Sequence, residues 1–231
     1  MYQFNSDHKQ YCESLTEYRR LQTQEVGVGH IPMGNGHPIR LQSMTNTDTN
    51  NTRATAGQIK RMADAGAEYA RMTTRTMKEA ENLKNIKEQL LQEGYHIPLV
   101  ADVHFNSNIA EKAAQIVEKV RINPGNYAIR YSRRGDFEEI RKHFIRLIEL
   151  CKANDTAIRI GVNHGSLSQR IMDLYGDTPQ GMVESALEFI KICEEQNFHN
   201  VVLSLKSSNT RVMVQANRLM VHEMLKRGHI Y

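Results

Sequence analysis

The chain has 231 residues, of which 40% are hydrophobic and 24% charged, so it can form one globular domain with a full core. No segment approaches the roughly 20 apolar residues that a membrane-spanning helix needs. The first 21 residues are polar and lack the apolar stretch of a signal peptide. The net charge of +4 is too small to indicate a nucleic-acid partner. Composition therefore argues against membrane and nucleic-acid binding, and favours the cytoplasm.

The three cysteines lie far apart in the sequence and form no C-x-x-C motif. They are Cys12, Cys151 and Cys193. This spacing favours neither a disulfide framework nor a local metal site. Cys151 and Cys193 lie in helix-like stretches, where we expect them to pack in the core.

Strand-like and helix-like segments alternate from residue 22 onward. Residues 22–33 and 37–44 are expected to pair as a β-hairpin across the turn Gly34-Asn35-Gly36. Later strands are predicted at 68–73, 97–102, 119–123, 156–162 and 200–205. Helices are predicted at 53–65, 76–94, 108–118, 136–153, 167–175, 179–196 and 209–227. The helix at 76–94 begins with the capping box of Thr76 and Glu79.

This alternation predicts an α/β fold with a parallel sheet, and six βα units favour a TIM-type (β/α) barrel. A complete barrel has eight units in about 250 residues, so the barrel is expected to be incomplete. We expect one domain over residues 1–231, divided into a leading arm (1–21) and a partial barrel (22–231).

Polar residues occupy only one of the two faces of each predicted strand. They are Arg71 and Thr73; Asp102, with His104 just beyond it; Arg121 and Asn123; Arg159, Gly161 and Asn163; and Ser204 and Lys206. The intervening positions are mostly apolar and suit contact with surrounding helices. In a barrel the other face points to the axis, and the active site lies at the carboxyl ends of the strands. The polar set is therefore expected to converge at that end.

Three arginines and one lysine in this set would place a concentrated positive charge at one mouth. The two nearby carboxylates, Asp102 and Asp48, cannot offset four cations, and unpaired buried charge is costly. Each arginine could instead pair with a carboxylate elsewhere in the barrel. Four cations on matching faces favour a polyanionic ligand, and the planar fork of arginine suits a diphosphate.

Three neighbouring motifs have both a functional and an ordinary interpretation. The Thr- and Asn-rich loop 45–52 could bind phosphate at a helix N-terminus, although an ordinary capped loop is the simpler interpretation. Asp102 and His104 are better explained as a hydrogen-bonding or proton-transferring pair than as metal ligands, because the first strand lacks a His-x-His motif. The loop 163–166 is either a ligand-binding loop or a plain turn.

Lys206 has a competing interpretation of its own. A lysine at the end of a barrel strand, with a pKa lowered by neighbouring cations, can form a Schiff base in an aldolase or lyase acting on a phosphorylated sugar. A non-catalytic barrel that binds a phosphate ligand is a third alternative.

Several motifs, in their order and spacing, resemble the N-terminal barrel of the 4-hydroxy-3-methylbut-2-en-1-yl diphosphate synthases of the methylerythritol phosphate pathway to isoprenoids. The motifs are HPIRLQSMTNTDT, ARMT, IPLVADVHFN, VRINPGN, IRIGVNHGSLS and VVLSLKSSN. The segments YCESLTEYRR and RIMDLYGDTPQGMVESALEF resemble the long, three-domain form of that family. The resemblance covers essentially the whole chain.

The resemblance implies a reductive ring opening and dehydroxylation of 2-C-methyl-D-erythritol 2,4-cyclodiphosphate. It implies that basic residues at the strand ends bind this cyclic diphosphate, at positions that match Arg71, Arg121, Arg159 and Lys206. Four further residues lie nearby: we expect Asn123 and Asn163 to join in binding, and Asp102 and His104 to be catalytic. Electrons would come from a [4Fe-4S] cluster held by three cysteines and a glutamate in a separate C-terminal domain, which closes over the barrel. Ferredoxin or flavodoxin would reduce the cluster.

The sequence departs widely from the family that it resembles. None of its cysteines lies at a cluster-ligand position, so no cofactor or metal ligand is expected in this chain. The iron-sulfur domain and the acidic residue after the seventh strand are also missing. The chain is therefore expected to be a truncated part of the enzyme, inactive alone. The sequence fits either electron donor, ferredoxin or flavodoxin, and it is also compatible with a homodimer.

Overall fold

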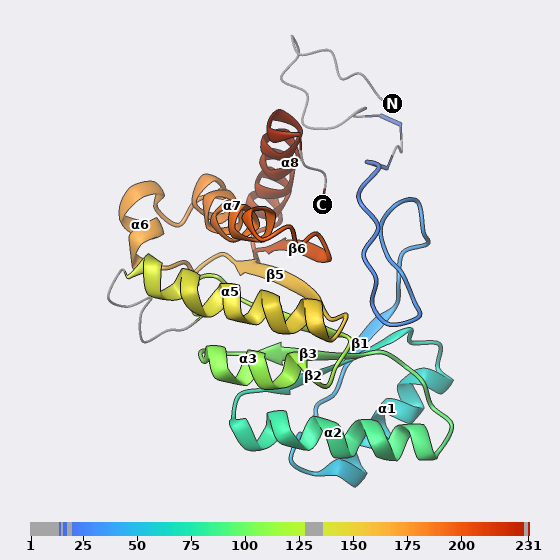
Figure 1. Ribbon diagram of the computed structural model, residues 1–231. Helices are drawn as coiled ribbons and strands as arrows, with labels where there is room; N and C mark the ends of the chain where they lie inside the picture. The colour runs from blue at the N-terminus through green and yellow to red at the C-terminus, as the bar shows by residue number, and fades with distance from the viewer. Residues whose placement is uncertain (1–13, 15, 18–19, 128–135, 229–230) are drawn as a thin grey trace.

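The computed structural model describes residues 14, 16–17, 20–127, 136–228 and 231 (Figure 1). The strands are β1 (Gln42–Met44), β2 (Tyr69–Thr74), β3 (Leu99–Val103), β4 (Lys119–Ile122), β5 (Ala157–Asn163) and β6 (Val201–Lys206). The helices are α1 (Thr52–Asp64), α2 (Met77–Gln92), α3 (Ser107–Ala114), α5 (Phe137–Ala153), α6 (Gln169–Tyr175), α7 (Pro179–Glu195) and α8 (Thr210–Arg227). Most of the predicted leading arm lies outside the described residues.

The six strands form one parallel sheet in the order β1-β2-β3-β4-β5-β6. Each strand pairs with its sequence neighbour, and β1 and β6 do not pair with each other. Figure 1 shows the helices packed along one face of this curled sheet. The predicted incomplete TIM-type barrel of six βα units is confirmed.

Side chains at the helix N-termini fix where most helices begin. Thr76 accepts a hydrogen bond from the backbone N–H of Glu79, whose carboxylate accepts from the backbone N–H of Thr76 in return. This is the predicted capping box, and it satisfies backbone donors that the first helical turn leaves free. Asp136 caps α5 in the same position, accepting from the N–H of Glu139.

The predicted N-terminal hairpin is wrong in its pairing. Residues 37–44 do not pair with residues 22–33; instead, β1 joins the barrel in parallel with β2. The chain folds back earlier, where Val26 and Met33 exchange both backbone hydrogen bonds, at 2.8 and 3.0 Å. Residues 34–36 (Gly-Asn-Gly) do form a turn, in which the N–H of His37 donates a hydrogen bond to the carbonyl of Gly34. This turn does not connect the two strands of a hairpin. The three residues of β1 are exposed, so what the parallel pairing gives this strand is backbone hydrogen bonding to β2 rather than burial.

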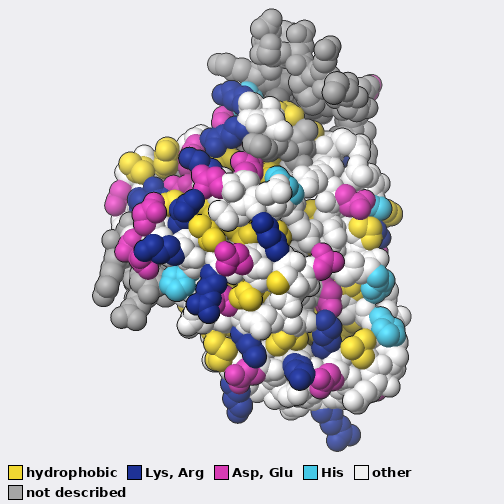
Figure 2. All heavy atoms as spheres, viewed as in Figure 1, with side chains coloured by type: hydrophobic (Ala, Val, Ile, Leu, Met, Phe, Trp, Pro, Cys, Tyr) yellow, Lys and Arg dark blue, Asp and Glu magenta, His cyan; other side chains and the backbone are white. Residues whose placement is uncertain are grey.

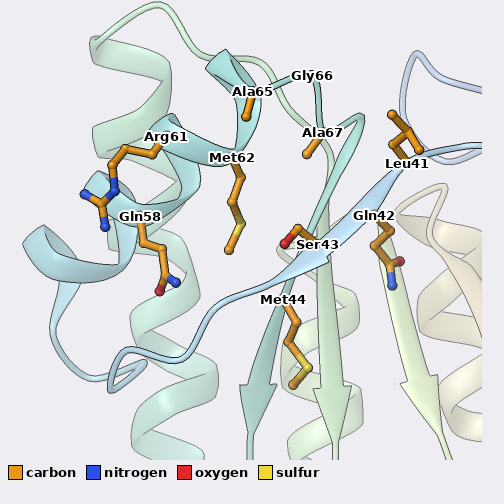
Figure 3. Close-up of a pocket in the computed structure, with 10 residues that line it drawn as sticks. All are labelled: Leu41, Gln42, Ser43, Met44, Gln58, Arg61, Met62, Ala65, Gly66 and Ala67. Carbon is orange, nitrogen blue, oxygen red and sulfur yellow. The ribbon is translucent and has the colours of Figure 1, made fainter.

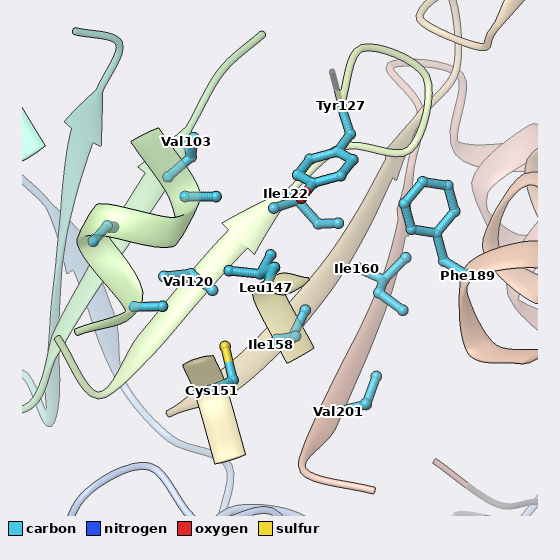
Figure 4. Close-up of a cluster of buried hydrophobic side chains, with 14 of the residues drawn as sticks. Val103, Val120, Ile122, Tyr127, Leu147, Cys151, Ile158, Ile160, Phe189 and Val201 are labelled. Atoms are coloured by element: carbon cyan, nitrogen blue, oxygen red, sulfur yellow. The ribbon is translucent and has the colours of Figure 1, made fainter. Parts of the chain in front are cut away.

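The main core lies between the sheet and the helices. Figure 4 shows Ile158 and Ile160 of β5 among side chains of β4, α5 and α7, and both isoleucines are fully buried. Phe144 of α5 packs against Phe189 of α7 with ring centroids 4.8 Å apart. Cys151 is also buried in this layer, as predicted.

A second, smaller core closes the amino-terminal end of the barrel. Its buried members are Val26, Val28, Tyr69, Val100 and Ala157. The hydroxyl of Tyr69 donates a hydrogen bond of 2.5 Å to the carbonyl of Ile31. The folded-back segment therefore serves as the floor of the barrel.

The outer edge of β1 borders a surface hollow of about 470 Å³ (Figure 3). Met44 and Met62 line it together with Gln42 and Gln58, from β1 and α1. It lies at the edge of β1, where Gln42 and Met44 are level with Tyr69 and Arg71 of β2. Within the described residues, no helix is both long and apolar enough to cross a membrane.

We predict that the floor segment stabilises the barrel. Val28→Ser would place an unpaired hydroxyl and a small cavity among fully buried side chains. Unfolding in urea should show a loss of about 2–4 kcal/mol. Ile39→Ser is the matched control, because Ile39 is 73% exposed. Equal effects of the two substitutions would contradict a structural role for the floor.

Candidate functional site

The strand register places the polar positions of four neighbouring strands in one row. Thr73 is level with Asp102, Asp102 with Arg121, and Arg121 with Arg159. Adjacent residues in a parallel sheet project to the same face. The alternate positions, such as Met72, Val120 and Ile158, lie in the core beneath the helices. The two faces of the strands therefore divide as the sequence predicts.

Asp102 is the centre of this row. Its two carboxylate oxygens accept hydrogen bonds from Arg71 at 2.6 Å and from Arg121 at 3.0 Å. Nε2 of His104 lies 3.4 Å from Oδ2. Burial raises the pKa of Asp102, but the hydrogen bond from His104 and the charges of the two arginines outweigh it and hold this pKa well below its usual range. Asp102 is therefore an anion that fixes three basic side chains in place.

Arg121 reaches across β5 because residue 161 has no side chain. The guanidinium is only 3% exposed and donates to the carbonyl of Gly161 at 2.9 Å. A Cβ atom at residue 161 would lie 2.5 Å from Nε of Arg121. Glycine at this position therefore makes room for the guanidinium.

Arg159 and Lys206 form no ion pair with a carboxylate in the described part of the chain. Nε of Arg159 donates to the hydroxyl of Ser204 at 3.0 Å. Burial, together with the charges of Arg71 and Arg121, lowers the pKa of Arg159 to about 10. Arg159 is thus charged at neutral pH. Burial and the neighbouring arginines also lower the pKa of Lys206, which ends β6 and is exposed.

The four predicted cations thus share one carboxylate among the described residues. Nε of Arg71 is buried and has no hydrogen-bond partner. Asp48 does not supply the missing charge: its carboxylate accepts from the backbone and side chain of Asn50. The interior face therefore has hydrogen-bond donors without acceptors and more positive than negative charge. This suits an anionic ligand with several oxygens.

The two predicted asparagines lie in different settings. The amide of Asn123 donates to the hydroxyl of Ser166 and accepts from the backbone N–H of Gly125, both at 3.0 Å. This buried side chain thus links the loops after β4 and β5. Asn163 ends β5, level with Lys206 of β6, and is partly exposed.

The loop motifs are engaged mainly within the protein. In loop 45–52, Thr49 donates to the carbonyl of Thr73, and Asn51 caps α1 by accepting from the N–H of Ala54. These contacts favour the ordinary capped-loop interpretation. In loop 163–166, the carboxylate of Asp177 accepts from the backbone N–H of Gly165 at 3.0 Å.

Sequence reasoning missed one interior cation, Lys119 of β4. It lies on the same face as Arg121, two residues earlier, and is only 2% exposed. Strand alternation could have identified it, but it lies at the start of the strand, away from the mouth.

The described residues do not fit an iron-sulfur cluster or another metal. Among them, no three His, Cys, Asp or Glu side chains group closely enough to hold a metal ion. Cys151 and Cys193 are free thiols in the helix layer, and burial raises the pKa of both far above the usual value. A buried protonated thiol is a poor ligand for iron.

The outer surface has a different charge pattern from the interior face. Figure 2 shows Lys and Arg side chains intermingled with Asp and Glu side chains over the helices. Arg141 of α5 pairs with Glu195 of α7, and Arg170 of α6 pairs with Glu188 of α7. On the face that Figure 2 shows, cations thus lie near carboxylates, unlike Arg159 and Lys206 of the interior face.

The fold and this face define a TIM-type barrel domain whose mouth is suited to an anion. The chain matches the family model described as "GcpE TIM-barrel domain" over residues 23–230, and it therefore belongs to the GcpE family.

Two curated relatives show how far the likeness extends. The chain is 54% identical over 225 residues to 4-hydroxy-3-methylbut-2-en-1-yl diphosphate synthase (flavodoxin) of Phocaeicola vulgatus, covering 93% of this chain and 37% of that protein. It is 47% identical over 234 residues to the chloroplastic, ferredoxin form of Oryza sativa subsp. japonica, covering 96% and 32%. The chain thus spans about a third of the length of these relatives.

A solved structure supports the fold alone. Phospho-2-dehydro-3-deoxyheptonate aldolase of Thermotoga maritima superposes with a TM-score of 0.51 and 11% identity, covering 81% of this chain and 48% of that one.

We predict that Gly161→Ala displaces Arg121. The added Cβ meets the guanidinium at 2.5 Å, so the unfolding free energy should fall by about 1–3 kcal/mol. Gly57→Ala in α1 is the matched control: its Cβ meets nothing nearer than 3.9 Å, and alanine in a helix is stabilising by roughly 0.5–1 kcal/mol.

A double-mutant cycle isolates the clash. In an Arg121→Leu background the cost of Gly161→Ala should shrink. An equal cost in both backgrounds would show that Arg121 is not what residue 161 accommodates.

Proposed function

We propose that this chain is the substrate-binding barrel of a reductase that converts 2-C-methyl-D-erythritol 2,4-cyclodiphosphate to 4-hydroxy-3-methylbut-2-enyl diphosphate. The observation that carries the proposal is the charge imbalance at the strand ends: among the described residues, Asp102 pairs with two of the four cations, and the other two have no carboxylate partner. The names of the relatives supply the product and the class of electron donor, and the family resemblance of the sequence motifs supplies the cyclodiphosphate substrate.

The four cations have two different roles in this proposal. Arg71 and Arg121 are fixed by Asp102, so they present donors in a set geometry before the substrate arrives. Such preorganisation lowers the cost of binding. Arg159 and Lys206, without a carboxylate partner, supply the positive charge that the diphosphate neutralises.

Asn123 and Asn163 complete the proposed binding set. Asn163 lies beside Lys206 and can reach a ligand at the mouth. The amide of Asn123 is occupied by Ser166 and Gly125, so its part in binding is to hold the two loops at the mouth.

Asp102 and His104 form the proposed proton-transfer pair. The carboxylate stays ionised because the arginines and His104 lower its pKa, so it cannot itself be the proton donor at neutral pH. His104 is partly exposed and lies 3.4 Å from Asp102. His104 is therefore the group that would deliver a proton to a leaving hydroxyl, with Asp102 orienting its ring.

Electron supply lies outside what this chain's described residues can do. Relatives are named as flavodoxin or ferredoxin enzymes, and we propose the same class of donor for the whole protein. In this proposal a [4Fe-4S] cluster in a separate C-terminal iron-sulfur domain supplies electrons to the bound diphosphate, so the present chain alone would bind without turning over. Free buried cysteines are consistent with a cytoplasmic compartment.

We predict that Arg159→Met weakens binding of the cyclodiphosphate at least tenfold in calorimetry. One charge-assisted contact contributes about 1.5–3 kcal/mol, and about 1.4 kcal/mol corresponds to a factor of ten. Arg159 is suited to this test because, among the described residues, its guanidinium donates to the hydroxyl of Ser204 and to no carboxylate. Arg218→Met, on the exposed face of α8, is the matched control. Unchanged affinity of Arg159→Met, or absence of binding heat for the unmodified chain, would refute the proposal.

A Schiff-base aldolase is the second candidate function, and Lys206 is the residue that supports it. Burial and three arginines lower the pKa of its amine. Treating the chain with dihydroxyacetone phosphate and borohydride distinguishes the two functions. The proposed reductase forms no adduct, whereas an aldolase leaves the sugar phosphate covalently bound to Lys206. Lys191, an exposed lysine of α7, reports the background of random labelling.

A further inference from the structure

Lys119 is a buried lysine that the proposed function leaves unexplained. Its side chain is 2% exposed and lies on the interior face of β4, below Arg121. The amine lies 4.4 Å from the centroid of the Tyr69 ring and 3.8 Å from Sδ of Met33. No carboxylate of the described residues pairs with it. A buried ammonium without an anionic partner is costly, so this site disfavours the charged form.

The described elements around the amine bring no carboxylate to it. Below it are the apolar floor residues Val26 and Val28, and β3 and β5 contribute Val100 and Ala157. The Tyr69 hydroxyl is engaged with the carbonyl of Ile31 and presents only its ring face to the amine.

The charged groups that act on Lys119 from β2 and β5 are Arg71 and Arg159. Burial, followed by the charges of these two arginines, lowers the pKa of Lys119 to about 7. The same two arginines belong to the proposed anion site. Any anion that offsets their charge therefore acts on Lys119 as well.

We propose that Lys119 is a further positioning residue of the anion site, which loses its proton in the empty barrel as the pH rises past neutrality and keeps it when a multiply charged anion lies on the arginines. Anion binding would then draw a proton into the floor of the barrel. The proton would come from solvent, and the new ammonium would add to the positive charge beneath the ligand. This inference rests on the proposed function, because it needs an anion at Arg71 and Arg159.

The sign of the pH effect follows from the direction of the shift. A bound anion raises the pKa of Lys119 above its value in the empty barrel. The contribution of Lys119 to affinity is therefore fully present below about pH 7 and is lost as the pH rises through the raised pKa of the complex. Proton uptake on binding is largest between the two pKa values.

The first experiment is calorimetry of inorganic pyrophosphate binding to the 231-residue chain at pH 7.5, in buffers of different ionisation enthalpy. The unmodified chain should take up more protons per pyrophosphate than Lys119→Met, by a measurable fraction of one proton. Methionine keeps the unbranched chain against Tyr69 and Met33, and the difference between the two proteins cancels the titration of pyrophosphate itself. Lys191→Met, on the exposed face of α7, should behave like the unmodified chain.

The second experiment needs no ligand. Below about pH 7, Lys119 is charged in both the folded and the unfolded chain, so the full penalty of its burial is present. The unmodified chain should therefore be less stable than Lys119→Met near pH 6, and this deficit should shrink as the pH rises toward the ordinary lysine pKa.

The outcomes separate the two proposals. Pyrophosphate binding with equal proton uptake by both proteins, or a stability deficit that does not change with pH, would overturn the role of Lys119 and leave the proposed function standing. Absence of pyrophosphate binding in every variant would overturn both.

Discussion

The ion pairs of Asp102 with Arg71 and Arg121 are the interaction on which the rest of the site depends. One buried carboxylate on β3 holds guanidinium groups from β2 and β4, at 2.6 and 3.0 Å. Breaking such a buried pair from one side leaves an uncompensated charge, which typically costs about 3–5 kcal/mol. Asp102 therefore fixes the arginines before any ligand is present, and the loss of its charge would release both.

The same carboxylate leaves the interior face positively charged. Arg159 and Lys206 gain nothing from Asp102 beyond distant attraction, and Lys119 beneath them is shifted toward its neutral form. An anion at the mouth would relieve this repulsion in all three. Stability of the empty barrel and affinity for the anion are thus opposed, which is the usual cost of a preformed charged site.

Much of the fold could be predicted from the sequence because its signals are local. Alternation of apolar and polar positions located five of the strands, and capping residues such as Thr76 and Asp136 located helix starts. The N-terminal pairing could not be predicted, because no local signal shows whether residues 37–44, counted as the first barrel strand, also pair with residues 22–33. Contact with β2, distant in sequence, decided it. Most of the polar face could also be identified from the alternation of side chains along each strand, which is a local signal. Which of these residues form ion pairs could not be predicted in this way.

The sequence by itself determined the parallel α/β architecture, the two faces of the strands and the set of cations at their carboxyl ends. These features follow from the types of residue present and from the alternation of side chains between the two faces of a strand. Only the tertiary structure decided that Asp102 serves two arginines, that Gly161 makes room for Arg121, and that Asn123 holds a loop. Each of these depends on distances between strands and loops far apart in the chain, which no local pattern encodes.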